Sequence, residues 1–143
     1  MKIKLLNDYA KIPTRGSDYA AGYDLYAGIK EAIYVYPKCT TMIDTGIAVE
    51  IPEGYFGAIF ARSGLASKFG LRPANCVGVI DSDYRGPIKV ALHNDGAIPY
   101  LVPQGERIAQ LVIIPYQSVD FEVVEELDDT ERGEGGFGST GKN

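Results

Sequence analysis

The sequence predicts an all-β domain with one short helix. Turn-forming groups such as Pro37-Lys38, Thr45-Gly46 and Pro52-Glu53-Gly54 separate short apolar runs, and such turns recur about every 8 to 12 residues. Apolar residues nowhere keep the 3.6-residue period of an amphipathic helix over roughly 12 residues or more. Short runs with regular turns are typical of β-sandwiches and β-barrels, so we expect one of these architectures.

The expected strands contain alternating apolar residues that can cover one side of a core. In the first run Lys2 and Lys4 alternate with apolar residues, which is typical of an edge strand. The expected extended segments are residues 1–6, 20–27, 33–36, 40–44, 47–51, 55–60, 71–79, 86–93, 100–102 and 107–115, with a last alternating run at 121–127. The one expected helix runs from Ser63 to Phe69, with Ser63 as its N-cap and Gly70 at its end.

Residues 78–86, GVIDSDYRG, form an unusual turn. An apolar start leads into Asp81, Asp83 and Tyr84, and an alternating apolar run follows Pro87. This order of apolar, turn-forming and alternating residues predicts a β-hairpin. A purely structural turn needs only glycine and aspartate or asparagine, whereas this one carries two carboxylates and a tyrosine. It is either a surface turn capped by the two aspartates or part of a functional site.

Length and charge restrict the classes of function. The 143 residues are enough for one domain with a hydrophobic core. The net charge of -5 argues against a nucleic-acid partner, because phosphate backbones are normally bound by a basic face. No apolar run approaches the roughly 20 residues that span a bilayer, and Asn7 and Asp8 interrupt the apolar patch near the start. We therefore expect neither a membrane partner nor a signal peptide.

Cysteine and histidine are rare in this chain. Cys39 and Cys76 lack CxxC spacing, so neither a disulfide framework nor a zinc site is expected. We expect both thiols to be reduced and the protein to be cytoplasmic, or, if it is viral, to lie in the cytoplasm or nucleus of the host cell. His93 is the only candidate for histidine-dependent catalysis.

The glycine-rich C-terminal segment differs from the rest of the chain. Residues 132–143, RGEGGFGSTGKN, contain a single apolar residue, Phe137. Such a segment buries too little surface to offset its backbone entropy, so alone it should be disordered. We therefore divide the chain into a β core, residues 1–128, and a flexible segment, residues 129–143. The segment is either a floppy terminus or a clamp in which Arg132 binds phosphate and Phe137 stacks on a ring.

Five motifs together resemble those of the trimeric dUTP pyrophosphatases (dUTPases). They are AGYDL at 21–25, RSGLA at 62–66, GVIDSDYRG at 78–86, GERIAQL at 105–111 and RGEGGFGSTG at 132–141. They follow the family's order and approximate spacing across nearly the whole chain. One departure is Ala61, where the family usually has proline, and it removes no functional side chain. The resemblance implies a homotrimer of distorted jelly-roll (β-clip) subunits with active sites at the subunit interfaces and a tail that closes over bound nucleotide.

The implied reaction is the hydrolysis of dUTP to dUMP and pyrophosphate, which supplies dUMP for thymidylate synthesis and keeps uracil out of DNA. By similarity to the family's DxxY pattern, Asp81 would orient the water that attacks the α-phosphate. Asp83 is the competing candidate, and its alternative role is that of a turn-capping carboxylate. Tyr84 would lie against the deoxyribose and leave no room for a 2′-hydroxyl.

The resemblance also implies that uracil is recognised largely by fixed backbone groups. Uracil and cytosine differ in the hydrogen-bonding pattern of one edge, and the wrong base leaves buried polar groups unpaired. The implied contacts are the side chain of Asn75 and main-chain groups of Gly78, Val79, Ile80 and Lys89. The alternative for Asn75 is a turn-forming role in a loop.

The implied phosphate contacts lie at the start of the short helix and in the tail. A helix N-terminus with exposed amides attracts anions. The contacts to the α- and β-phosphates would be Arg62, Ser63, Gly64 and Gln110, and those of the tail to the γ-phosphate and the base would be Arg132, Phe137, Gly138 and Ser139. Gln110 could instead be an ordinary strand side chain that faces solvent. Arg107 is left out of the site because a structural role explains it as well.

Magnesium is the implied cofactor, and Asp24 is the implied residue that acts on it. Mg²⁺ keeps several waters and often binds mainly through substrate phosphates, so one carboxylate that touches its water shell suffices. The metal would also explain how a chain with a net charge of -5 accepts an anionic nucleotide. The alternative for Asp24 is a capping role.

Two other functions fit the same scaffold. A dCTP deaminase, or a bifunctional deaminase-dUTPase, would carry a catalytic glutamate on the strand that follows the turn, and residues 88–92 read IKVAL. Such enzymes also usually lack the glycine-rich tail. A non-catalytic dUTP-binding regulatory module should have lost Asp81, Gln110 or the tail, and all three are present.

Overall fold

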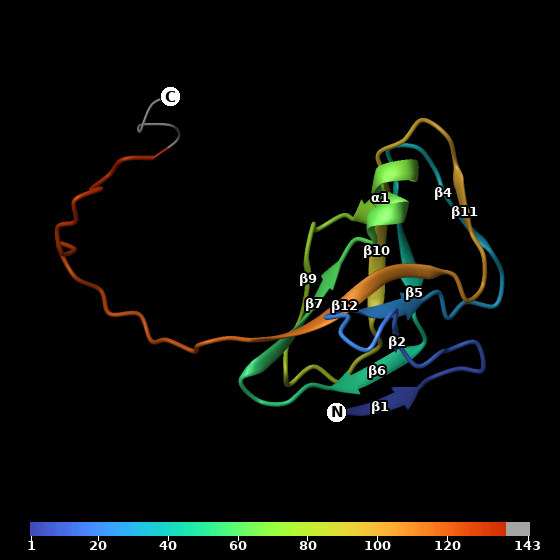
Figure 1. The fold of residues 1–143 in the computed structure, drawn as a ribbon, viewed down its shortest axis with the longest axis horizontal. Helices are drawn as coiled ribbons and strands as arrows, with labels where there is room; N and C mark the ends of the chain where they lie inside the picture. The colour runs from blue at the N-terminus through green and yellow to red at the C-terminus, as the bar shows by residue number, and fades with distance from the viewer. Residues whose placement is uncertain (137–143) are drawn as a thin grey trace.

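The structure, a computed structural model, describes residues 1–136 and has the predicted all-β character with one short helix (Figure 1). Its elements are β1 (Lys2–Leu5), β2 (Thr14–Arg15), β3 (Tyr23–Tyr26), β4 (Ile33–Val35), β5 (Thr40–Asp44), β6 (Ile47–Glu50), β7 (Tyr55–Phe60), α1 (Ser63–Phe69), β8 (Leu71–Pro73), β9 (Gly78–Ile80), β10 (Lys89–Asn94), β11 (Tyr100–Val102) and β12 (Arg107–Pro115). Within this part of the chain, α1 is not long and apolar enough to cross a membrane.

The core lies between a five-stranded and a three-stranded sheet. The larger sheet has the order β2-β3-β12-β7-β9 and the smaller one the order β5-β10-β8, while β1-β6 and β11-β4 form two-stranded ribbons. Leu25 and Leu111 from the larger sheet join Ile43 and Leu92 from the smaller one in a single buried cluster. Alternation along each strand directs apolar side chains into this cluster and leaves polar ones outside.

The predicted hairpin after residue 78 is wrong. β9 pairs with β7, whereas β10 pairs with β5 and β8, so the two segments belong to different sheets. Ile88 already bonds to the segment at residues 45–47. Its N–H donates to Ile47 O at 2.8 Å, and its carbonyl accepts from Thr45 N at 3.2 Å. Residues 81–88, which we call the crossover loop, therefore connect two sheets.

The helix has the predicted limits but a different N-cap. Arg62, with extended φ and ψ of -84° and 128°, is the N-cap, and no side chain caps the helix there. Ser63 therefore lies inside the first turn, where its carbonyl accepts a hydrogen bond from Ser67 Oγ at 2.7 Å. The predicted end is confirmed, since Gly70 has the left-handed φ of 69° that glycine adopts without strain.

Beyond β12 the chain leaves the body as an extended arm (Figure 1). Residues 116–136 contain no helix or strand, and Phe121 and Val123 of the alternating run are 95% and 98% exposed. In the described chain this run therefore has no sheet to join. The predicted boundary after residue 128 lies within the arm and stays a prediction.

Candidate functional site

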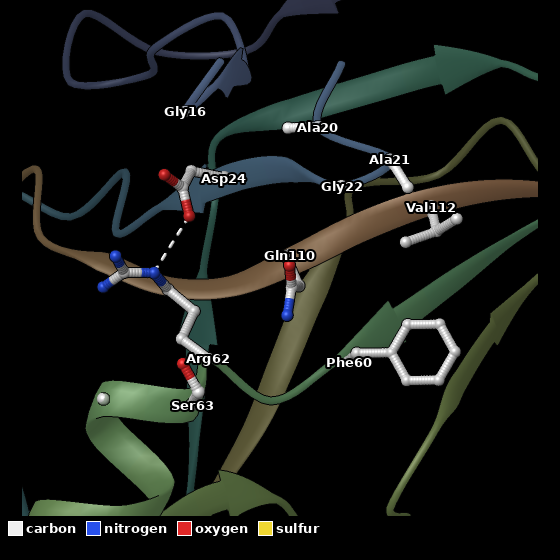
Figure 2. A pocket seen from close by; sticks show the side chains of 11 residues that line it. Gly16, Ala20, Ala21, Gly22, Asp24, Phe60, Arg62, Ser63, Gln110 and Val112 are labelled. Atoms are coloured by element: carbon white, nitrogen blue, oxygen red, sulfur yellow. Dashed lines mark hydrogen bonds and ion pairs between the residues drawn. The ribbon is translucent and has the colours of Figure 1, made fainter.

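A cavity of about 400 Å³ lies between β3, β12 and the start of α1 (Figure 2). We call it the arginine cavity. Its polar lining comes from Asp24 of β3, Arg62 and Ser63 at the start of α1, and Gln110 of β12. The rest of the lining is small or apolar and consists of Gly16, Ala20, Ala21, Gly22, Phe60, Gly64 and Val112.

Strand register explains why these residues meet. On the central strand β12, Gln110 lies opposite Asp24 of β3 on one side and opposite Phe60 of β7 on the other. Residues directly opposite in adjacent strands point to the same face of the sheet. β7 then leads through Ala61 into the N-cap Arg62, which brings the start of the helix to that face.

Asp24 is held between two arginines. Arg62 Nε donates to its Oδ1 at 2.9 Å and Arg107 Nη1 donates to its Oδ2 at 3.1 Å, while Arg62 Nη1 donates to the carbonyl of Arg107 at 3.1 Å. The Asp24 side chain is only 15% exposed and that of Arg62 27%, so solvent screens their pair poorly. Figure 2 shows the Arg62 side chain reaching from the helix towards Asp24. These bonds fix the guanidinium of Arg62 in place.

This arrangement limits how a metal could bind. Both carboxylate oxygens of Asp24 already accept from arginines, so a direct bond to a cation would compete with an ion pair. Among residues 1–136, no three His, Cys, Asp or Glu side chains are grouped so that they could hold a metal ion. A single carboxylate that is already bonded to arginines fits a metal ion whose ligands are mostly phosphate oxygens and water.

Gln110 is fixed inside the arginine cavity. Its Nε2 donates to the carbonyl of Ala61 at 2.9 Å, so its side chain is engaged in the site and is not a free surface group. A methyl group in place of the Gly22 hydrogen would lie 2.6 Å from Gln110 Oε1, so only glycine leaves the amide where it is.

A second cavity, of about 340 Å³, lies beside the crossover loop. We call it the aspartate–tyrosine cavity, and it is lined by Met42, Val79, Ile80, Asp81, Tyr84, Pro87 and Lys89. Tyr84 folds over Gly86, where a Cβ would clash with its ring and hydroxyl, and its hydroxyl donates to Pro87 O at 3.2 Å. Lys89 Nζ lies 3.4 Å from Asp44 Oδ1. The tyrosine ring therefore has a defined position at one wall.

The two candidate aspartates occupy different places. Asp81 lines the aspartate–tyrosine cavity and also an adjoining acidic cleft, whereas Asp83 lines only the cleft, together with Glu53 and Arg85. Arg85 Nη1 donates to the carbonyl of Ser82 at 2.6 Å and not to either carboxylate. Asp81 is thus the aspartate that borders the cavity with Tyr84.

The structure divides the predicted site residues into separate groups. Asp24, Arg62, Ser63, Gly64 and Gln110 line the arginine cavity, whereas Val79, Ile80, Asp81, Tyr84 and Lys89 line the aspartate–tyrosine cavity. Asn75 is exposed with its Nδ2 beside Gly78, about 3.5 Å from where a Cβ on that glycine would lie. Among the predicted residues within 1–136, none lines both cavities.

The tail residues stand apart from both groups. Arg132 is exposed on the arm, where its Nε donates to Gly135 O at 2.8 Å. Phe137, Gly138 and Ser139 lie outside the described residues, so their predicted contacts stay predictions.

Sequence reasoning missed several residues of these cavities. Arg107 was left out of the site because a structural role explains it as well; it does not line the arginine cavity, but it donates to Asp24, and its place in the GERIAQL motif was the available signal. Gly22 precedes Asp24 in the AGYDL motif and makes room for Gln110. Met42 comes from β5, and no motif marks it.

Known proteins resemble this chain over nearly its whole length. The dUTPase family model matches residues 8–141. A deoxyuridine 5'-triphosphate nucleotidohydrolase from Syntrophotalea carbinolica is 48% identical over 141 residues, covering 99% of this chain and 96% of the relative. The enzyme of that name from Candida albicans is 46% identical over 145 residues, covering 100% of this chain and 89% of the relative.

Solved structures give the same result for the fold. The Staphylococcus bacteriophage 80alpha dUTPase with dUpNHpp has a TM-score of 0.91 and 34% identity, covering 99% of this chain and 98% of that one. A mutant dUTPase from phage phi11 of S. aureus, described for its coordination of a structural Mg(II) ion, has a TM-score of 0.79 and 30% identity, covering 87% and 96%. The predicted jelly-roll-like β fold is confirmed by this similarity.

Proposed function

The chain belongs to the dUTPase family and is a dUTP-hydrolysing enzyme, and we propose that each active site combines the arginine cavity of one copy of the chain with the aspartate–tyrosine cavity of another. The observation that carries the proposal is that the two cavities have different polar groups. One cavity presents a fixed arginine at a helix start, which suits phosphate, and the other presents an aspartate beside a tyrosine ring, which suits a sugar and a reacting water.

In the phosphate half, Arg62 and Gln110 bind the α- and β-phosphates. Asp24 and the carbonyl of Arg107 hold Arg62 from one side, and the guanidinium has further N–H groups to donate. Gln110 Nε2 has a second hydrogen besides the one donated to Ala61 O. Ser63 and Gly64 add backbone amides from the first turn of the helix.

In the nucleoside half, Asp81 accepts a proton from the water that attacks the α-phosphate. The new bond joins the water oxygen to the α-phosphorus, the bond from that phosphorus to the bridging oxygen breaks, and pyrophosphate leaves. Tyr84 packs against the deoxyribose, where its fixed ring excludes a 2′-hydroxyl. The uracil edge is read by the side chain of Asn75 and by main-chain groups of Gly78, Val79, Ile80 and Lys89.

The two halves meet between copies of the chain, in a homotrimer. Each copy supplies its arginine cavity to one site and its aspartate–tyrosine cavity to another. The separation of the cavities within one chain supports this assembly. The arm then brings Arg132 and the tail residues Phe137, Gly138 and Ser139 over the bound nucleotide, excluding water and aligning the reactants.

Mg²⁺ would be held mainly by the substrate phosphates, with Asp24 near its water shell. The ion supplies positive charge that neutralises the triphosphate. Because both oxygens of Asp24 bind arginines, its effect on the ion is indirect, through Arg62 and through water. We also propose a cytoplasmic location, which fits an enzyme of nucleotide metabolism with two cysteines outside disulfides, Cys39 and Cys76.

The test is product analysis on the purified chain with Mg²⁺ and, separately, dUTP, dCTP, dTTP and UTP. We expect only dUTP to yield its monophosphate and pyrophosphate on anion-exchange chromatography. Asp81→Asn should abolish the reaction, while the matched variant Asp83→Asn keeps it, and removal of residues 132–143 should lower it with the fold intact. Consumption of dCTP would support a deaminase instead, and binding of dUTP without turnover would support a regulatory module.

A further inference from the structure

The carboxylate of Glu106 is unusual for a residue at the start of a strand. Its Oε1 accepts a hydrogen bond of 2.5 Å from the hydroxyl of Tyr100. Its Oε2 is shielded from solvent and has no hydrogen-bond donor among residues 1–136. A shielded carboxylate oxygen costs free energy unless nearby positive charge or donors compensate it. Glu106 therefore needs a compensating partner.

One positive charge near this pair is that of Arg62. Burial and the hydrogen bond to Glu106 raise the pKa of Tyr100 to about 12, whereas the positive charge of Arg62 acts in the opposite direction, so the guanidinium lies within electrostatic reach of this pair. The Tyr100 phenol therefore stays protonated at ordinary pH and donates to Glu106.

Backbone contacts join Glu106 to the same arginine. Gly105 N donates to Ala27 O and Ala27 N donates to Glu106 O, both at 2.8 Å, which fixes the turn before β12. The next carbonyl, that of Arg107, accepts from Arg62 Nη1 at 3.1 Å. The Tyr100 ring also packs against Phe69 at the end of α1, with ring centroids 5.1 Å apart. Glu106 thus connects the start of β12 to the helix that Arg62 begins.

At the arginine cavity one carboxylate is bonded to two arginines, and a second carboxylate follows in the chain. Asp24 is the only carboxylate bonded to Arg62 and Arg107 in residues 1–136, so one negative charge faces two positive ones. Glu106, next to Arg107 in the chain and within reach of Arg62, supplies the second negative charge without blocking the cavity, which it does not line. It has no bond of its own to Arg62, so it can act on the guanidinium only through Tyr100 and the backbone that ends in the Arg107 carbonyl, and it leaves the other N–H groups of Arg62 to a ligand.

We infer that Glu106 is a positioning residue that, through Tyr100 and the backbone at residues 105–107, sets the guanidinium of Arg62 for the phosphates. This inference rests on the proposed function, because it assumes that the arginine cavity binds the triphosphate. Glu106 does not touch the substrate. Its loss should therefore weaken binding of the phosphates and leave binding of the nucleoside unchanged.

The test compares two competitive inhibitors, the non-hydrolysable dUpNHpp and deoxyuridine, which has no phosphates. Glu106→Gln, which keeps the shape and removes the charge, should raise the inhibition constant of dUpNHpp about tenfold, the effect of losing one charge-assisted interaction. The constant for deoxyuridine should not change. Glu106→Asp should restore part of the loss, and Tyr100→Phe should show a smaller shift in the same direction.

The control is Glu50→Gln, which removes a carboxylate that pairs with Lys2 on the surface, at 3.1 Å. It should change neither inhibition constant. Equal weakening of both inhibitors by Glu106→Gln, or no weakening of dUpNHpp, would overturn the inference. If that variant does not fold in thermal unfolding, Tyr100→Phe decides by the same criterion. Failure of the wild-type chain to hydrolyse dUTP would instead overturn the proposed function.

Discussion

The two cavities differ in how far the chain itself fixes their side chains. In the arginine cavity, Asp24, Arg62 and Gln110 are all hydrogen-bonded within the chain, and the Asp24 side chain is 15% exposed. In the aspartate–tyrosine cavity, Val79 is 60% exposed, and within residues 1–136 no hydrogen bond joins the carboxylate of Asp81 to the crossover loop. The polar side chains of the first cavity are therefore preorganised, whereas in the second cavity Tyr84 is held but the carboxylate of Asp81 is not.

Preorganisation suits the tasks that we assign to each half. Binding a highly charged triphosphate is costly if charged side chains must first be ordered, so prior fixation of Arg62 lowers that cost. A carboxylate that activates water must instead keep free lone pairs, which a network of hydrogen bonds would occupy. We therefore expect substitutions in the aspartate–tyrosine cavity to change mainly kcat and those in the arginine cavity to change mainly KM.

The largest effect is expected for Asp81→Asn. The amide cannot take a proton from water, so kcat for dUTP should fall about 10²- to 10⁴-fold, while KM changes little because no binding contact is lost. Steady-state kinetics with released pyrophosphate as the signal measure both constants. Asp83→Asn, in the acidic cleft only, is the control. A larger loss in that variant would exchange the roles of the two aspartates.

Asp24→Asn should have the next largest effect, and mainly on KM. Without the carboxylate, Arg62 and Arg107 repel each other and Arg62 loses its fixed position. We expect KM for dUTP to rise about 10- to 100-fold and the free energy of unfolding to fall by about 1 to 3 kcal/mol, as for a partly buried charged hydrogen bond.

Urea unfolding and the Mg²⁺ dependence of the rate test this prediction together. The control Glu50→Gln breaks a solvent-exposed pair and should cost less than about 1 kcal/mol. If Asp24→Asn shifted the Mg²⁺ requirement strongly but left stability unchanged, Asp24 would act on the metal directly.

There is a physical reason why the sequence predicts some element limits correctly and not the strand pairing. The limits of β5, β7, α1 and β12 match their predicted ranges because alternation, turns and the Gly70 C-cap are local signals. The predicted hairpin was wrong because the strands on either side of the crossover loop do not pair with each other. Gly78–Ile80 pairs with β7, and α1 and β8 lie between these two strands in the sequence. Pairing partners depend on the packing of the whole core.

The site shows the same limit at single residues. Serine favours the N-cap position, but Arg62 occupies it because its side chain is held by Asp24 and by the carbonyl of Arg107, contacts between distant strands that no local pattern contains. The family resemblance supplied Arg62, Gln110 and Asp81 as site residues. It did not supply the fact that one chain places the first two in one cavity and Asp81 in another.

A smaller effect is expected for Gly22→Ala. The new methyl group would lie 2.6 Å from Gln110 Oε1 and must push the amide away from Ala61 O. We expect KM for dUTP to rise up to about tenfold through the loss of one hydrogen-bonding contact. Gly16→Ala is the matched control, because its Cβ would meet nothing within 4 Å and Gly16 lines the same cavity. Equal effects of the two variants would contradict the fixed position of Gln110.

The smallest effect concerns the free energy of unfolding at high pH. It tests the Tyr100–Glu106 pair, which we connect to the arginine cavity. Tyr100 has its pKa raised from 10.0 to about 12, first by burial and then by its hydrogen bond to Glu106. The folded protein therefore keeps this proton at a pH where the unfolded chain loses it. The resulting stabilisation is complete below pH 10 and disappears as the pH rises to about 12. Near neutral pH the phenol is protonated in both the folded and the unfolded state, so Tyr100 makes no contribution there to the pH dependence of stability.

Tyr100→Phe removes this titration, so its stability should decline less steeply than that of the wild type between pH 10 and 12. Urea unfolding at a series of pH values measures the slopes, and Tyr19→Phe, at a fully exposed tyrosine, is the control. Parallel slopes in all three proteins would mean that the Tyr100–Glu106 pair opens to solvent. The Tyr100–Glu106 pair would then be no better fixed than the carboxylate of Asp81, and this part of the contrast between the two cavities would disappear.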